Sequence, residues 1–185
     1  PDVYQGSPTP VTAFLSVVPN GAALVVVARL AWALAPATVT PRWTTLLAAV
    51  AVLSMVIGNL VAISQRDVKR MLAYSGIAHM GYAVVGIVAF GFEGLTGTLV
   101  YLAAYTVMNI AAFAVVSAFS ESEDEPHLLT DLAGQGWERP WMSFALAVAM
   151  FSLAGIPPTV GFVAKFLVFR AAVNEQLVWL SVVGV

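Results

Sequence analysis

Long apolar runs separated by short polar stretches dominate this sequence. Most of the runs reach the roughly 20 residues that an α-helix needs to cross the hydrocarbon core of a bilayer. The second run is the clearest, since residues 43–63 carry no charged side chain. The pattern therefore predicts an all-α, polytopic integral membrane bundle of about five complete spans and one truncated span. The predicted spans are residues 10–32, 43–63, 70–90, 95–119, 141–172 and 177–185.

Prolines, tryptophans and polar stretches mark the boundaries of these spans. Pro8 and Pro10 suit a helix start, where a missing N–H costs little. All five tryptophans fall at predicted span ends, where amphipathic rings lie at the headgroup level. We expect residues 2–9 to form a polar loop, residues 64–70 a tight charged loop and residues 120–140 a polar connection.

Composition supports lipid as the solvent and excludes several functions. The chain is 60% apolar and 10% charged, whereas about a quarter of the residues in soluble domains are charged. A net charge of −2 without a basic patch argues against nucleic-acid binding. Absence of cysteine excludes thiolate-held iron–sulfur clusters and disulfides from this segment. Because residue 1 is proline and the last residues are apolar, we expect the intact protein to continue at both ends.

The basic residues are unevenly shared between the two ends of the predicted bundle. Loops 64–70 and 120–140 are separated by two spans, so they lie on the same side. They carry most of the Lys and Arg residues found in loops, which favours the cytoplasm for this side. These residues are Arg66, Lys69, Arg70 and Arg139.

Lys165 is the residue most indicative of function, because a lysine within an apolar span is costly and marks an ion path by default. It follows Gly155, Pro157 and Pro158, which remove helical donors and loosen the backbone. The sequence therefore predicts a fifth span broken into two half-helices, with Lys165 beyond the break. The alternative is a lysine that extends to the membrane interface or forms a structural pair.

Other polar side chains recur at helical spacing inside the predicted spans. His79 has Ser75 and Tyr82 on its face and can relay protons, although it can equally be a neutral residue that joins two helices. Two rows at four-residue spacing can hold water or serve as interhelical hydrogen bonds. The rows are Thr12, Ser16 and Asn20, and Tyr101, Tyr105 and Asn109.

Three blocks in order along the chain resemble the subunit N family of bacterial NADH:quinone oxidoreductase (complex I), which is antiporter-like and translocates protons. The blocks are PDVYQGSPTPVTAF at 1–14, KRMLAYSGIAHMGY at 69–82 and SLAGIPPTVGFVAKF at 152–166. The resemblance implies helices eight to twelve and the start of thirteen in an inverted-repeat fold, located in the bacterial inner (plasma) membrane. It also implies a proton path through Lys165, with His79, Asn20, Tyr101, Tyr105 and Asn109 as further members.

The resemblance places the redox chemistry outside this chain. It implies no cofactor here, with NADH, FMN, iron–sulfur clusters and quinone in partner subunits of the complex. Asn20 is a departure, because the family usually carries a lysine there. Two alternatives remain: a membrane subunit of a multisubunit cation/proton antiporter, or a structural assembly subunit that has lost pumping.

Overall fold

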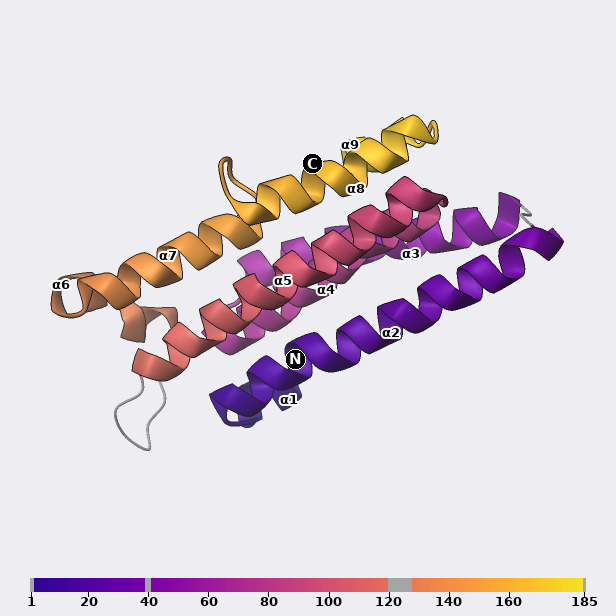
Figure 1. The fold of residues 1–185 in the computed structure, drawn as a ribbon. Helices are drawn as coiled ribbons and strands as arrows, with labels where there is room; N and C mark the ends of the chain where they lie inside the picture. The colour runs from indigo at the N-terminus through magenta and orange to yellow at the C-terminus, as the bar shows by residue number, and fades with distance from the viewer. Residues whose placement is uncertain (1, 39–40, 120–127, 185) are drawn as a thin grey trace.

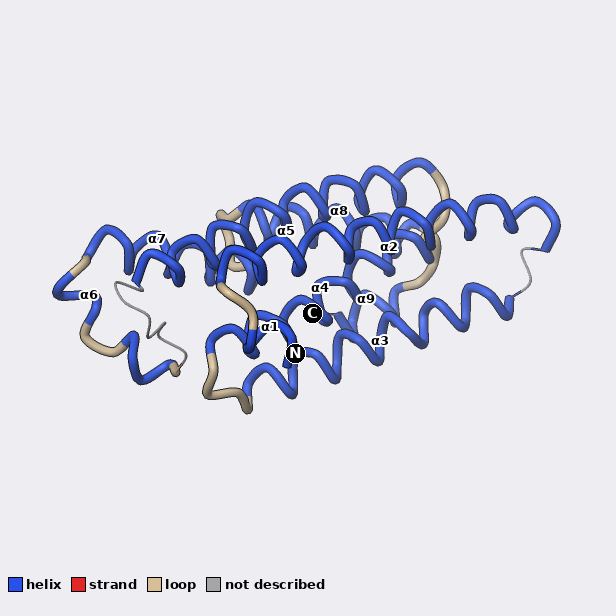
Figure 2. The backbone as a smooth tube through the Cα atoms, turned by 90° about the horizontal axis from the view of Figure 1, so that it is seen from below, coloured by secondary structure: helices blue, strands red, loops and turns tan. Residues whose placement is uncertain are grey.

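The computed structural model describes residues 2–38, 41–119 and 128–184, and these form a bundle of helices that run along one common axis (Figures 1 and 2). Four of the helices are long and apolar enough to cross a membrane, and they coincide within a few residues with the first four predicted spans. The α-helices are α1 (Asp2–Gly6), α2 (Thr9–Thr38), α3 (Pro41–Ile63), α4 (Val68–Val88), α5 (Phe92–Phe119), α6 (Gln135–Glu138), α7 (Pro140–Ala154), α8 (Val160–Asn174) and α9 (Val178–Gly184).

The largest differences from the sequence prediction lie at the ends of the bundle. Residues 2–9 contain the short helix α1 rather than only a loop, because its side chains pack on α2 and α4. The predicted connection 120–140 contains α6 and a 3₁₀ turn (Leu129–Leu132), while residues 120–127 lie outside the described part of the chain. The predicted last span, residues 177–185, corresponds to α9, and its final residue Val185 lies outside the described part of the chain.

Helix α4 begins two residues earlier than predicted. Asp67 is its N-cap, and its carboxylate accepts a hydrogen bond from the backbone N–H of Arg70 at 2.8 Å, which satisfies one of the free amides of the first turn. Lys69 and Arg70 therefore belong to the helix and not to the loop before it. The backbone N–H of Leu129 also bonds to the carbonyl of Arg66 at 2.9 Å, so the two predicted loops do lie at the same end of the bundle.

Helices α4 and α5 form the centre of the bundle. Helix α5 packs against α2, α4, α7 and α8, and α4 also packs against α3. The α3–α4 contact is close because glycines face it: a Cβ added to Gly58 would lie 2.6 Å from the backbone nitrogen of Ala78, and one added to Gly81 would lie 2.8 Å from the carbonyl of Ala51. Small residues of this kind let membrane helices approach each other.

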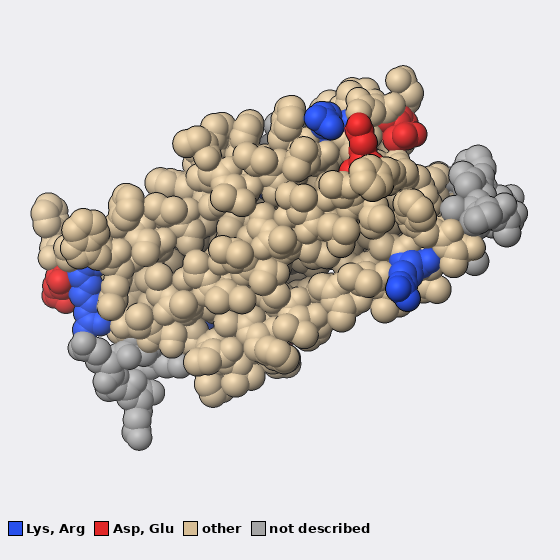
Figure 3. Space-filling model, viewed as in Figure 1, with Lys and Arg blue, Asp and Glu red and all other residues tan. Residues whose placement is uncertain are grey.

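Charged side chains lie at the two ends of the bundle, with a wide uncharged belt between them on the face shown in Figure 3. The belt is formed by outward-facing apolar side chains of several helices, of which Leu53, Leu60, Val107, Phe144 and Phe151 are examples. An apolar belt with charged rims matches the hydrocarbon core and headgroup zones of a bilayer. The described residues therefore have the surface of a multi-pass membrane protein.

Candidate functional site

The helical path is interrupted between α7 and α8, at the residues where the sequence predicts a break (Figure 1). Gly155 ends α7 with a φ of 82°, a left-handed conformation that favours glycine. Pro157 and Pro158 then have no N–H to offer the last carbonyls of α7. Helix α8 starts after Thr159. The interruption leaves the carbonyl of Ala154 without its helical donor.

The two half-helices approach each other very closely beside the break. A Cβ added to Gly161 would collide with the carbonyl oxygen of Ser152. The Ser152 hydroxyl accepts a hydrogen bond from the N–H of Gly161 at 3.2 Å and contacts the sulfur of Met108 on α5 at 2.8 Å. Ser152 is not among the predicted site residues, although a hydroxyl in the apolar run directly before the break was an available signal.

Lys165 turns back from α8 toward the break. Its Nζ donates a hydrogen bond to the Ala154 carbonyl at 3.0 Å and lies 4.5 Å from the centre of the Tyr82 ring. A Cβ added to Gly155 would lie only 2.9 Å from Cδ of Lys165, so the lysine stem lies directly over this glycine. A cation at the C-terminal end of a helix and over an aromatic face is stabilised by both. Lys165 is therefore directed to the break and to Tyr82 of α4.

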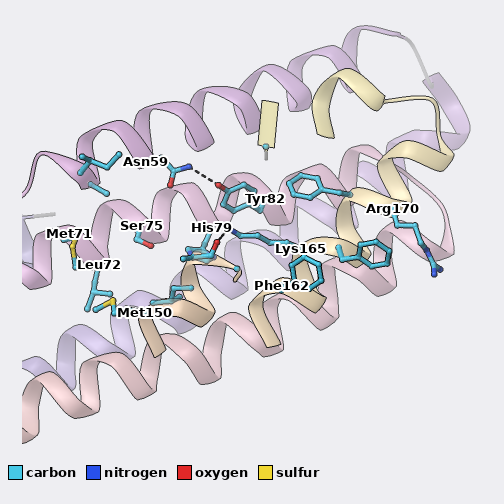
Figure 4. A pocket seen from close by; sticks show the side chains of 18 of the residues that line it. Asn59, Met71, Leu72, Ser75, His79, Tyr82, Met150, Phe162, Lys165 and Arg170 are labelled. Atoms are coloured by element: carbon cyan, nitrogen blue, oxygen red, sulfur yellow. Dashed lines mark hydrogen bonds between the residues drawn. The ribbon is translucent and has the colours of Figure 1, made fainter. Parts of the chain in front are cut away.

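A half-open cavity of about 830 Å³ lies in front of Lys165 (Figure 4). Most of its lining is apolar, and the polar groups come from three elements: Lys165 and Arg170 from α8, His79, Ser75 and Tyr82 from α4, and Asn59 from α3. The amide of Asn59 donates to the Tyr82 hydroxyl at 2.9 Å. Asn59 is not among the predicted site residues, because it is a single amide within the apolar run of the second span.

His79 is buried between α4 and α5. Its Nδ1 lies 2.6 Å from the Tyr101 hydroxyl, and its ring centre lies 5.0 Å from that of Tyr105 and 5.8 Å from that of Tyr82. No hydrogen bond joins His79 to Lys165 within the described part of the chain, and the Tyr82 ring contacts both of them. Tyr82 thus connects the lysine at the break to the histidine.

The row on α5 continues the polar contacts to α2. The Asn109 amide donates to the Ser16 hydroxyl at 2.5 Å, and the Tyr105 hydroxyl donates to the Ser16 carbonyl at 3.4 Å. Ser16, Tyr105 and Asn109 are all buried. We call the set Ser16, Asn109, Tyr105, Tyr101, His79, Tyr82 and Lys165 the polar layer; its members come from α2, α5, α4 and α8.

Asn20 and Thr12 differ from the simple row that their spacing predicts. Asn20 is half-buried and donates to the Ser16 carbonyl at 2.8 Å, so it meets the polar layer only at its α2 end. The Thr12 hydroxyl donates to the carbonyl of Tyr4 at 3.0 Å and so binds α1. Spacing along a helix gives the face of a side chain but not which neighbour it contacts.

A second lysine, which lies in the predicted charged loop 64–70, is buried. Lys69 is 1% exposed, and its Nζ donates to the carbonyl of Ser7 at 3.1 Å. Next to it, Arg70 forms an ion pair with Asp2 at 3.0 Å and donates to Gln5 at 3.1 Å. These contacts hold α1 against the first turn of α4. The Asp67 cap was the available signal that Lys69 lies inside a helix.

Comparison with known proteins gives the family of the chain. A family described as "NADH:quinone oxidoreductase/Mrp antiporter, TM" matches residues 1–185. The chain belongs to this family. Subunit N of the NADH-quinone oxidoreductase of Trichlorobacter lovleyi is 45% identical over 185 residues, which are 100% of this chain and 38% of that relative. The chain thus spans less than half the length of the relatives it matches.

Solved structures of the family agree with the fold. Respiratory complex I from Thermus thermophilus matches with a TM-score of 0.82 and 36% identity over 100% of this chain and 39% of that one. The Mrp complex from Dietzia sp. matches with a TM-score of 0.86 and 26% identity over 98% of this chain and 33% of that one. The subunit N relative of Trichlorobacter lovleyi confirms the resemblance that the three sequence blocks indicate, and the solved structures agree with the antiporter-like fold.

Proposed function

We propose that this chain is part of a proton-translocating membrane subunit of a bacterial NADH:quinone oxidoreductase, the counterpart of subunit N. The subunit couples quinone reduction elsewhere in the complex to proton transport through the membrane. It binds the other membrane subunits of complex I and the lipid bilayer. NADH, FMN, iron–sulfur clusters and quinone belong to its partners. It lies in the inner (plasma) membrane, with loops 64–70 and 120–140 in the cytoplasm.

In this proposal α7 and α8 together form the fifth span. Each has 15 residues, fewer than the roughly 20 that one crossing requires, and they follow one another in the same direction (Figure 1). Helix α9 then starts a sixth span, and the whole is part of an antiporter-like inverted-repeat fold. Backbone that is not helical at membrane depth is tolerated where it lines a cavity or is covered by protein, and Gly155, the first residue of the break, lines the Lys165 cavity.

One observation carries the proposal: Lys165 bridges the helix break and contacts the ring of Tyr82, its neighbour in the polar layer. At this place an amine has a carbonyl, an aromatic face and a cavity within reach, so it can hold or release a proton with small movements of its side chain. His79 and Tyr101 supply the next exchangeable protons at 2.6 Å from each other. Tyr105, Asn109, Ser16 and Asn20 continue the proposed path to α2.

The experiment is the replacement Lys165→Ala in the full-length subunit within the intact complex. Assembly is checked on a native gel, and quinone reduction and proton transport are measured in reconstituted vesicles. We expect the complex to assemble and the number of protons transported per quinone reduced to fall. Arg29→Ala is the control, since Arg29 is an exposed basic residue of α2 that does not line the Lys165 cavity. Proton transport at the wild-type ratio in Lys165→Ala would favour a structural assembly subunit.

The second candidate is a membrane subunit of a multisubunit cation/proton antiporter, which the similarity to the Mrp complex supports. The sequence identity is higher toward complex I, at 36% against 26%, and this favours the first proposal. Transport driven by NADH and abolished by a quinone-site inhibitor is the result expected for the first. Exchange of sodium for protons without NADH is the result expected for the second.

A further inference from the structure

A proline in the middle of α2 creates a second backbone gap. Pro19 has no N–H, so the carbonyl of Leu15, four residues earlier, cannot receive its usual helical hydrogen bond. Nevertheless α2 continues from Thr9 to Thr38. The missing donor is supplied from another element: the Tyr4 hydroxyl of α1 donates to the Leu15 carbonyl at 3.2 Å. An unpaired carbonyl in a membrane helix is costly, so this contact stabilises α2 where the proline weakens it.

Several contacts hold Tyr4 in this position. Arg70 of α4 binds Asp2 of α1, Lys69 of α4 binds Ser7 directly after α1, and Thr12 of α2 binds the carbonyl of Tyr4. The Tyr4 ring is half-buried and packs against the core. Helix α1 is therefore fixed from both neighbouring helices, with the tyrosine directed to the gap.

Tyr4 also contacts Asn20, which adjoins the α2 end of the polar layer. The Asn20 side chain interacts with the Tyr4 hydroxyl while it donates to the Ser16 carbonyl at 2.8 Å. Burial raises the pKa of Tyr4, and the Asn20 side chain offsets part of that rise. The hydroxyl is therefore neutral at physiological pH and can donate to Leu15 and accept from Asn20 together. One hydroxyl thus serves a backbone carbonyl and a member of the proposed path.

We propose that Tyr4 is a positioning residue of the proton path, which closes the backbone gap at Pro19 and holds Asn20 against Ser16. The inference rests on the proposed function. Helix α1 thereby becomes part of the site, because its Tyr4 positions Asn20 at the α2 end of the proposed path. The buried Lys69 holds α1 in place through Ser7. Neither the polar rows nor the three sequence blocks assign a role to Tyr4.

The test uses Tyr4→Phe in the full-length subunit within its complex, alone and together with Pro19→Ala. Hydrogen–deuterium exchange of the α2 segment around Leu15 should rise roughly fivefold in Tyr4→Phe, the change that one lost hydrogen bond gives. In the double variant, the N–H of residue 19 can bond to Leu15, so exchange should return to the wild-type rate. Proton transport per quinone should stay lowered in both variants, because the contact with Asn20 is missing in both. Tyr74→Phe on α4 is the control.

The outcomes separate two roles of Tyr4, as a donor to the Leu15 carbonyl and as a partner of Asn20. Recovery of both exchange and proton transport in the double variant would overturn the inference, because Tyr4 would then serve only the carbonyl. Unchanged exchange in Tyr4→Phe would overturn it as well. Lys165→Ala is measured in parallel: if it also leaves proton transport intact, the proposed function fails, whereas a loss in Lys165→Ala with none in Tyr4→Phe refutes the Tyr4 inference alone.

Discussion

Two prolines of the bundle each deprive a backbone carbonyl of its helical N–H donor, but the helix continues at one of them and ends before the other. At Pro19, α2 remains helical and the freed carbonyl of Leu15 accepts from the Tyr4 hydroxyl. At Pro158, the helix has already ended and the freed carbonyl of Ala154 accepts from the Lys165 ammonium. Both repairs come from a side chain outside the helix that contains the carbonyl. The two sites differ in how many backbone hydrogen bonds are missing and in which side chain replaces the missing donor.

The number of backbone defects decides whether the helix continues. A single missing N–H leaves the neighbouring hydrogen bonds of α2 in place, so one hydroxyl suffices. Gly155 in the left-handed conformation followed by two prolines removes several consecutive bonds, and the chain leaves the helix. The second site thereby exposes a carbonyl to a cavity, where a titratable amine can bind it. A broken helix gives the amine room to change partners, whereas the continuous helix fixes its hydroxyl.

The largest effect is expected from detaching α1, which would remove the repair at Pro19. Lys69→Ala deletes a buried stem and leaves the Ser7 carbonyl without this donor, so we expect a loss of about 3 kcal/mol. The apparent melting temperature of the solubilised complex and the amount of assembled subunit measure it. Arg66→Ala is the control, because Arg66 is exposed in the preceding loop. Equal stability of both variants would show that Lys69 does not hold α1.

The next effect separates backbone strain from displacement of the lysine at the break. Gly155→Ala forces alanine into a φ of 82° and brings its Cβ to 2.9 Å from Lys165 Cδ. The strain costs about 2 kcal/mol, and the lysine must move. Gly134→Ala has nearly the same φ, 88°, with no atom within 4 Å of the added Cβ. We expect both variants to lower the melting temperature but only Gly155→Ala to lower proton transport per quinone.

A smaller effect is expected at Tyr82, the residue between the lysine and the histidine. Tyr82→Phe removes the bond from Asn59, which is worth about 1 kcal/mol, and keeps the ring under Lys165. Tyr82→Leu removes the aromatic face as well. We therefore expect near-normal proton transport in Tyr82→Phe and a clear decrease in Tyr82→Leu. A decrease of the same size in both would assign the role to the hydroxyl instead.

The smallest effect on assembly is expected for Asn20→Lys. Asn20 is half-buried beside Tyr4 and Ser16, so a lysine amine has polar partners there. We expect the complex to assemble on a native gel with measurable proton uptake in vesicles. Absence of the assembled complex at normal expression would show that the position serves packing, and it would favour the scaffolding alternative.

The sequence was informative where one residue type has one structural consequence. Two adjacent prolines after a glycine end a helix in almost any surroundings, and a lysine in an apolar run must find compensation, so the break and the position of Lys165 followed from the residues alone. Tyr4 and Lys69 were not found in this way. Their roles depend on α1 packing against α4, a contact between residues more than sixty positions apart in the chain.

The same limit applies to the partners within the polar layer. Periodicity places Ser16, Tyr105 and Asn109 on inward faces, but it cannot tell that Ser16 receives both of the others. Asn59 was hidden because a single amide hardly changes the apolar character of α3. Pairings between helices follow from the packing of small residues such as Gly58 and Gly81, which sets the register of α3 on α4.

The most direct test of the account is a structure of the intact complex at a resolution that shows ordered water molecules. The account predicts Lys165 Nζ in contact with the Ala154 carbonyl and the Tyr82 ring, with water in the Lys165 cavity that links the amine to His79. It also predicts that the layer continues through Tyr101, Tyr105 and Asn109 to Ser16. A Lys165 side chain turned to lipid, or an apolar and dry gap between Lys165 and His79, would contradict it.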